Sequence, residues 1–164
     1  MATPVVIWGR FMEMKYSSAK TAGCVLMRGK IGRYLFEIHN CHGNHPTAYI
    51  HLPKGYPLDN ILEPWWKEAY NNGDESCWLP ELYDGIMLPV HGGLTYDGLS
   101  DSKRHGIVLG WDYGHCGDWC GHLDGVSTLR YEEGTPPKKW SVLEILSEVR
   151  DGVKWLERRR LKKA

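Results

Sequence analysis

Residues 141–156, SVLEILSEVRDGVKWL, carry the clearest structural signal in the chain. Ser141 and Glu144 have the S-x-x-E spacing of a capping box, in which each side chain satisfies a backbone donor at the start of a helix. Apolar residues then recur at helical spacing: Val142, Leu146, Val149, Val153 and Leu156. Since this spacing is typical of an amphipathic helix, we expect a long C-terminal helix packed across a sheet.

Short apolar or alternating runs elsewhere in the chain are typical of strands. The expected strands are residues 24–28, 33–38, 47–52, 86–90 and 106–112, with a GKIG turn between the first two. Residues 61–70 are predicted to form a short helix that contains Trp65 and Trp66. Because helices and strands are segregated along the chain, the sequence predicts one α+β domain over residues 1–164, with a mostly antiparallel sheet.

Charge and composition limit the possible functions. The 164 residues contain 20 basic and 20 acidic side chains, whereas proteins that bind duplex nucleic acid usually carry a basic excess. The first residues lack the features of a signal peptide, and no stretch approaches the roughly 20 apolar residues of a membrane helix. We therefore expect a cytoplasmic protein that binds neither membranes nor duplex nucleic acid, with its cysteines present as thiols or metal ligands.

The sequence VHGGLTY places a histidine and two glycines at the predicted end of a strand. Gly92 and Gly93 permit positive φ angles, and the backbone amides near them suit a phosphate or carboxylate group. Thr95 and Tyr96 offer hydroxyl groups in an extended run. The alternative interpretation is a β-hairpin or bulge that leaves His91 on the surface.

The sequence GWDYGHCGDWCGH places Asp112, His115 and Asp118 at every third position. Neither a strand nor a helix would bring these three side chains together, but a turning loop with Gly114 and Gly117 would. Their convergence would create a carboxylate–imidazole general-base pair or a metal site with oxygen and nitrogen ligands. Alternatively, Asp112 caps a turn, and His115 and Asp118 are solvated.

Cysteine and histidine residues also offer a possible zinc site with four ligands. The four ligands would be Cys116, Cys120, His122 and Cys41, with His42 or His45 as further candidates beside Cys41. Their spacing differs from the tight C-x2-C pairs that identify zinc sites most clearly. Buried free thiols and exposed histidines explain the same residues without a metal.

Three motifs in the same order resemble an uncharacterised family of small proteins that are encoded mainly by bacteriophages and prophages. The family pattern reads V-P-x-G-H-P-L, then V-H-G-G-L-T-[YF], then [WF]-G-F-D-x-x-H-x-G-D, and the resemblance spans residues 48–155. The matching positions are Pro53, Gly55, Pro57 and Leu58, then His91, Gly92, Gly93, Leu94, Thr95 and Tyr96, then Gly110, Asp112, His115, Gly117 and Asp118.

The departures from the family pattern matter as well. Tyr56 stands where the family usually has His, and Trp111 stands where it usually has Phe. Cys116, Cys120 and His122 lie outside the pattern, so a zinc site would not be a family property. The resemblance implies a phage context, and with it host takeover or counter-defence, but it implies no established activity.

Together these features predict a pocket in which His91 faces the loop that carries Asp112, His115 and Asp118. A nucleotide or another small phosphorylated molecule would bind there and be sequestered or hydrolysed. Stacking on the base would come from Trp111, Trp119 or Tyr96. In a hydrolase, such as a phosphodiesterase, His115 would be the general base, oriented by Asp112 or Asp118. His91 would be the acid or a phosphate contact, and a divalent metal on the two aspartates is a variant of this mechanism.

Two other functions remain open at the level of sequence. The protein could inhibit a host enzyme through an aromatic surface, in which case the His and Asp motifs only hold loops in place. The residues of that surface would be Trp65, Trp66, Trp78 and Tyr83. It could also be a small accessory protein stabilised by zinc. The chain contains no P-loop, nucleophile elbow or H-E-x-x-H motif that would favour a known catalytic class.

Overall fold

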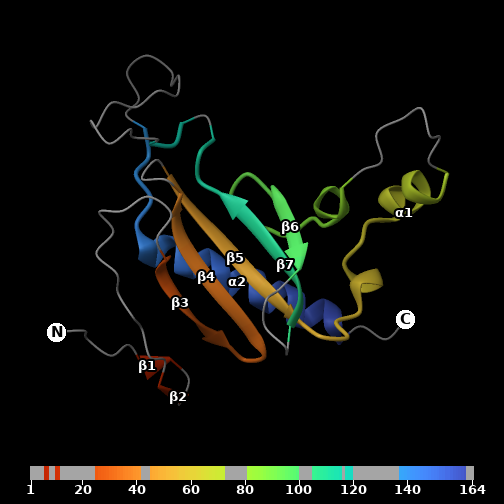
Figure 1. Ribbon diagram of the computed structural model, residues 1–164, viewed down its shortest axis with the longest axis horizontal. Helices are drawn as coiled ribbons and strands as arrows, with labels where there is room; N and C mark the ends of the chain where they lie inside the picture. The colour runs from red at the N-terminus through yellow and green to blue at the C-terminus, as the bar shows by residue number, and fades with distance from the viewer. Residues whose placement is uncertain are drawn as a thin grey trace.

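Five strands pair in an antiparallel sheet with the order β3-β4-β5-β7-β6, and helix α2 crosses one face of the sheet (Figure 1). The strands are β3 Val25–Ile31, β4 Tyr34–Cys41, β5 His45–Pro53, β6 Tyr96–Leu99 and β7 His105–Asp112. A separate ribbon pairs β1 (Val6–Ile7) with β2 (Arg10–Phe11). This computed structural model describes residues 6–7, 10–11, 25–41, 45–72, 81–99, 105–115, 117–119 and 137–161. The predicted α+β class and antiparallel sheet are confirmed.

The first hairpin, between β3 and β4, turns at Gly32, whose backbone adopts a positive φ of 58°. Ile31 pairs with Tyr34 across the turn, so the two strands are connected by only two residues. Glycine suits this position because other residues rarely adopt a left-handed backbone. The predicted strand pair is confirmed, but most of the expected turn sequence belongs to β3.

The sheet turns apolar side chains of β4 and β5 toward α2. These buried side chains are Tyr34, Phe36, Ile38, Ala48, Ile50 and Leu52. They alternate with more exposed residues because successive side chains of a strand point to opposite faces. Leu109 and Trp111 of β7 continue the same core.

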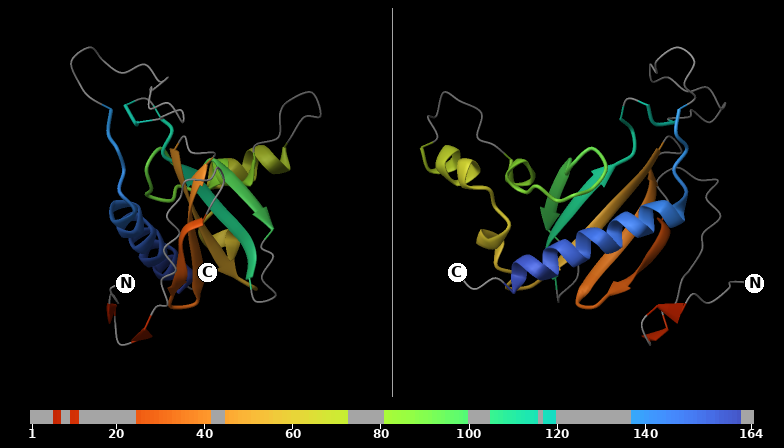
Figure 2. Two further views of the ribbon diagram at one scale, coloured as in Figure 1. Left: turned by 60° about the vertical axis from the view of Figure 1, so that its left-hand side comes forward. Right: turned by 180° about the vertical axis from the view of Figure 1, so that it is seen from behind.

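Helix α2 (Val142–Arg160) forms the other half of the core (Figure 2). The Ser141 hydroxyl accepts a bond from the Glu144 N–H group, and the Glu144 carboxylate accepts one from the Ser141 N–H group, which confirms the capping box. The buried residues of the helix are Ile145, Leu146, Val149, Gly152, Val153 and Leu156. Each fully buried aliphatic side chain contributes roughly 1.5–3 kcal/mol, so this stripe holds the helix on the sheet.

Residues 86–90 were predicted as a strand and take another form. Ile86 makes an isolated bridge with Leu62, while the N–H groups of Leu88 and Val90 bond to carbonyls only two residues back. These local bonds take the place of a ladder with a neighbouring strand, so the strand prediction is wrong. The expected burial is nevertheless correct for Ile86 and Leu88.

Helix α1 (Pro64–Asn71) confirms the short helix predicted at residues 61–70 and begins at its proline, as expected for a residue without an N–H group. Two 3-10 turns, η1 (Leu58–Asn60) and η2 (Leu82–Gly85), lie before and after it in the chain. Within the described residues, no helix combines the length and apolar character needed to cross a membrane.

Candidate functional site

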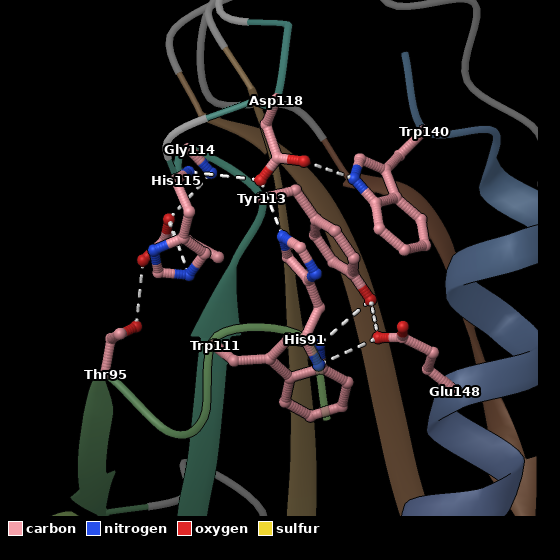
Figure 3. Close-up of polar contacts among 10 residues, drawn as sticks. His91, Thr95, Trp111, Tyr113, Gly114, His115, Asp118, Trp140 and Glu148 are labelled. Carbon is pink, nitrogen blue, oxygen red and sulfur yellow. Dashed lines mark hydrogen bonds and ion pairs between the residues drawn. The ribbon is translucent and has the colours of Figure 1, made fainter. Parts of the chain in front are cut away.

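The four polar residues predicted to converge lie together beyond the end of β7 (Figure 3). We call His91, Asp112, His115 and Asp118 the His–Asp cluster. Asp112 is the last residue of β7, and His115 and Asp118 lie in the loop that follows. His91 comes from a separate part of the chain, in the turn after segment 86–90. The ring centroids of His91 and His115 are 5.2 Å apart.

Asp118 is the buried centre of the cluster and is only 3% exposed. Its Oδ2 atom accepts hydrogen bonds from His91 Nε2, at 2.7 Å, and from the His115 backbone N–H group, at 3.1 Å. Its Oδ1 atom accepts one from Trp140 Nε1 at 2.7 Å. These donors offset the cost of burying a carboxylate. The alternative in which Asp118 is solvated is therefore wrong.

The hydrogen bond to Asp118 determines the tautomer of the His91 ring. Because the carboxylate accepts, Nε2 carries the proton, and Nδ1 of a neutral ring keeps its lone pair. The ring of His91 stacks on Tyr113, with centroids 5.4 Å apart and an interplanar angle of 2°. Trp140 contacts His91 at a centroid distance of 4.7 Å. Two aromatic rings and a carboxylate thus hold this imidazole.

Helix α2 reaches the same place through Glu148. Its Oε2 atom accepts a bond from the Tyr113 hydroxyl at 2.7 Å and one from the His91 backbone N–H group at 3.2 Å. The Tyr113 hydroxyl also accepts a bond from Trp111 Nε1 at 2.9 Å. Burial first, and the bond to Glu148 second, raise the pKa of Tyr113 well above its usual value. The hydroxyl therefore remains a donor at neutral pH.

Asp112 and His115 form the more open half of the cluster. Asp112 Oδ1 accepts a bond from the Gly114 N–H group at 2.8 Å, and Oδ2 accepts one from the Thr95 hydroxyl at 3.0 Å. Asp112 thus caps a turn, as the alternative interpretation expected. His115 Nε2 lies 3.8 Å from Asp112 Oδ1, beyond hydrogen-bonding distance, and this buried atom has no hydrogen-bond partner among the described residues. The His115 side chain is 32% exposed.

The two glycines after His91 have different surroundings. Both have positive φ, 66° at Gly92 and 81° at Gly93. A Cβ atom at Gly92 would lie 1.9 Å from His115 Nε2, whereas one at Gly93 would meet open space. Gly92 therefore lets the His115 ring approach the backbone.

The amides near these glycines do not form the predicted phosphate site as a group. The His91 N–H group donates to Glu148, and the Gly93 N–H group donates to the Val90 carbonyl at 3.1 Å. Since both donors are already bonded within the protein, that prediction is wrong for these two amides.

The aromatic residues predicted to stack on a ligand lie in different environments. Trp111 is 1% exposed and lies in the core, so the prediction that it stacks on a ligand is wrong. Tyr96 is 47% exposed but packs edge-on against Tyr49 on the sheet. Trp119 is half-buried, with Lys139 Nζ 4.6 Å from its ring centroid. Trp140, which was not predicted, is the indole that contacts His91.

The first motif of the phage-like pattern lies at the other end of α2. The Tyr56 hydroxyl donates to the Leu156 carbonyl at 2.7 Å, and burial of the ring raises the pKa of Tyr56 to about 12. Tyr56 thus anchors the helix. Its hydrogen bond gives it a structural role in this chain.

The zinc hypothesis falls mainly on residues outside the described part of the chain. Cys116, Cys120, His122 and His42 all lie there, and the described Cys41 is a free thiol at the end of β4. Within the ranges that the structure describes, no three His, Cys, Asp or Glu side chains form a group that could hold a metal. The four-ligand zinc site therefore remains a prediction. Asp112 and Asp118 lie within the described ranges, where they bond to different donors and belong to no group that could hold a metal, so the structure does not support the metal on two aspartates.

The sequence matches no known family model, and no curated protein or solved structure is significantly similar to it. The function therefore has to be inferred from the side chains of the chain itself.

Proposed function

We propose that the His–Asp cluster binds a small phosphorylated ligand, such as a nucleotide or a nucleotide-derived signal, and sequesters or hydrolyses it. One observation carries this proposal: the two imidazoles lie 5.2 Å apart, and each faces its own carboxylate. His91 is fixed by Asp118, and His115 lies beside Asp112. A pair of imidazoles with nearby carboxylates suits both anion binding and proton transfer near neutral pH.

Two lysine side chains near the cluster would favour an anionic ligand, and one of them, Lys138, also pairs with Glu144 Oε1 at 3.4 Å. Lys138 Nζ lies 3.3 Å from the ring centroid of Trp140, the indole that contacts His91. Lys139 lies over Trp119 in the neighbouring segment, whose backbone is bonded to Lys138. A ligand phosphate would meet His91 Nδ1 and the exposed part of the His115 ring, because His115 Nε2 is buried against Gly92. The nitrogens of a protonated imidazole all donate. Trp140 or Trp119 would offer its ring to a base.

In the hydrolytic version, His91 is better placed than His115 to act as the general base. Asp118 accepts a bond from the His91 ring but only from the backbone of His115, so only the His91 imidazole is oriented by this carboxylate. His91 Nδ1 would accept a proton from water as the water attacks phosphorus. His115 would donate a proton to the leaving oxygen as the P–O bond breaks. These roles reverse the sequence-based prediction.

The inhibitor hypothesis has less support. Trp66 is buried, and its indole donates to the Glu81 carbonyl at 2.8 Å, so this ring cannot insert into a partner protein. Tyr83 is partly buried, and Trp78 lies outside the described residues. Among the described residues of the predicted aromatic surface, Trp65 is the one that is well exposed, at 50%. One exposed indole is a small anchor for an inhibitory interface.

The resemblance to phage-encoded proteins suggests what the ligand would be used for. In that setting, sequestration or hydrolysis of a host nucleotide signal would serve counter-defence. This biological role is part of the proposal and depends on the ligand being found.

The proposal is tested by incubating the protein with a panel of linear and cyclic nucleotides. Melting temperature and product formation are measured in parallel. A ligand at 100 times its Kd stabilises the native state by about 2.7 kcal/mol, so binding is visible as a melting shift even without turnover. A shift without product indicates sequestration, and product indicates hydrolysis. The proposal is wrong if neither occurs across the panel.

Two variants make the test specific. His115→Asn removes the imidazole that has no hydrogen-bond partner among the described residues, so the fold should be retained while the shift or product is lost. His39→Asn is the matched control, because His39 hydrogen-bonds Glu37 at 2.8 Å and contacts Tyr49 on the sheet. Equal loss in both variants would contradict the proposal. Loss of biological activity only in Trp65→Ala would favour the inhibitor hypothesis.

A further inference from the structure

One oxygen of Glu148 joins two parts of the chain that both control His91. Oε2 accepts the bond from the Tyr113 hydroxyl, and the Tyr113 ring lies parallel to the His91 ring. The same oxygen accepts the bond from the His91 backbone N–H group. A single side chain on α2 therefore holds the backbone of His91 and the surface on which its imidazole stacks (Figure 3).

The chain around His91 has little stiffness of its own. Gly92 and Gly93 follow it directly, and both adopt left-handed backbone angles that glycine visits at little cost. Glycine restricts the backbone less than other residues do, so the two residues after His91 contribute little to its orientation. The bonds to Glu148 restrict this orientation from outside the loop.

The charge of Glu148 is unusual for a simple anchor. In the described part of the chain, Glu148 forms no ion pair with a lysine, arginine or histidine side chain. Its Oε2 atom is bonded by a hydroxyl and a backbone amide, which are neutral donors. Two bonds to one ionised acceptor are stronger and more directional than bonds between neutral groups, which suits a group that must be held in place.

We propose that Glu148 is a positioning residue for His91. It holds the imidazole against Asp118 in the tautomer with the proton on Nε2, which leaves Nδ1 for the ligand. This inference rests on the proposed function, because positioning is useful only if His91 acts on a ligand. The sequence of helix α2 suggests only a packing role. In this proposal the helix also contributes a residue to the site.

The test is a nitrogen-15 NMR measurement of the histidine rings without ligand, since ring nitrogen shifts report which nitrogen carries the proton. In the wild type, His91 should show one tautomer, protonated at Nε2. Glu148→Ala should give a mixture of both tautomers or a broadened signal. Glu148→Gln should restore the wild-type pattern, because an amide oxygen can still accept both hydrogen bonds.

Glu157→Ala is the matched control. Glu157 lies on the same helix and also accepts a bond from a tyrosine hydroxyl, that of Tyr34 at 2.8 Å. Its replacement removes the same kind of contact but touches neither His91 nor Tyr113. The His91 signal should therefore stay as in the wild type.

The NMR results can contradict the proposed role of Glu148 in several ways. A wild-type His91 signal in Glu148→Ala would overturn the inference, and so would a Glu148→Gln signal like that of Glu148→Ala. If Glu148→Ala does not fold, Tyr113→Phe removes one of the two bonds and keeps the stacked ring, and an unchanged His91 signal there would also overturn it. If the tautomer result holds but no nucleotide binds to the wild type, the proposed function fails while the positioning contact stands.

Discussion

The two ends of α2 are tied to the sheet by the same pair of groups, a tyrosine hydroxyl and a glutamate carboxylate. Toward the C-terminus, Tyr34 donates to Glu157, whose charge is met by Arg160 at 2.6 Å and Arg33 at 3.8 Å. Closer to the N-terminus, Tyr113 donates to Glu148, which has neutral donors and two imidazoles nearby. The first anchor is neutralised by opposite charge, whereas the second has no ion-pair partner among the described residues.

This difference separates a structural contact from a candidate site with the same hydrogen bond. At the C-terminal end, Tyr56 adds a bond to the Leu156 carbonyl, and Asn60 adds one to the Arg159 carbonyl. All these contacts fasten the helix. At the other end, most polar contacts converge on His91 and Asp118, and they orient side chains in addition to fastening the helix.

The largest effect is expected for Asp118→Asn. Both carboxylate oxygens of Asp118 accept hydrogen bonds from N–H groups. The asparagine side chain would place its NH2 group opposite one of these donors, so the free energy of unfolding should fall by about 3 kcal/mol. At the C-terminal end, Glu157→Gln should cost less than about 1 kcal/mol, because that carboxylate is partly exposed. Urea unfolding of both variants measures the difference. Equal losses would show that the polar contacts at the two ends of α2 do not differ in their effect on stability.

A second contrast compares the two tyrosines. Tyr113→Phe should lower the free energy of unfolding by about 2 kcal/mol, because it leaves the buried Trp111 N–H group without its acceptor. Tyr34→Phe should cost about 1 kcal/mol, because Glu157 keeps its bond to Arg160. Thermal or urea unfolding distinguishes them. A larger loss for Tyr34→Phe would reverse the comparison.

A third comparison tests whether Gly92, unlike Gly93, makes room for the His115 ring. Gly93→Ala should cost about 1 kcal/mol, because it places alanine at a positive φ, and Gly92→Ala should cost more because its Cβ also overlaps a neighbouring ring. Only Gly92→Ala should also displace the His115 ring, since its Cβ would overlap Nε2. The ring resonances of His115 should therefore shift in Gly92→Ala and stay in Gly93→Ala. Shifts of the same size in both would mean that the close approach at Gly92 has no role.

The smallest expected effect is the pH dependence of the stability that Glu157 contributes at the C-terminal end of α2. The Arg160 guanidinium, and then the Tyr34 hydroxyl, hold the pKa of Glu157 below its usual value. The stabilising contribution is therefore present above the unfolded pKa of about 4.3 and is lost as the pH falls through the folded value. Between neutral pH and pH 3, the difference in unfolding free energy between wild type and Glu157→Gln should shrink. A difference that grows on acidification would contradict the assignment.

Features that depend on the spacing of nearby residues could be predicted from the sequence. The capping box at Ser141 and the apolar stripe predicted α2, and the three-residue spacing of Asp112, His115 and Asp118 predicted a turning loop. Both signals depend on the chemistry of neighbours along the chain. The strand expected at residues 86–90 failed because burial alone does not distinguish a strand from an irregular buried segment.

The partners within the cluster could not be predicted, because they come from distant segments. Asp118 bonds the ring of His91, 27 positions away, and Trp140, 22 positions away. Glu148 shows no sequence feature that separates it from other polar residues of an amphipathic helix. Trp111 was expected near a ligand because it adjoins Asp112, but neighbours in a strand point to opposite faces and its ring enters the core.

The most direct test of the central claim is to titrate the protein with the nucleotide panel and follow the ring resonances of its histidines by NMR. If one ligand lies between the two imidazoles, the signals of His91 and His115 should move together with a single dissociation constant, while His39 stays unchanged. If no nucleotide moves either signal, or if His39 moves as much as they do, the cluster is a structural contact and the account of the site is wrong.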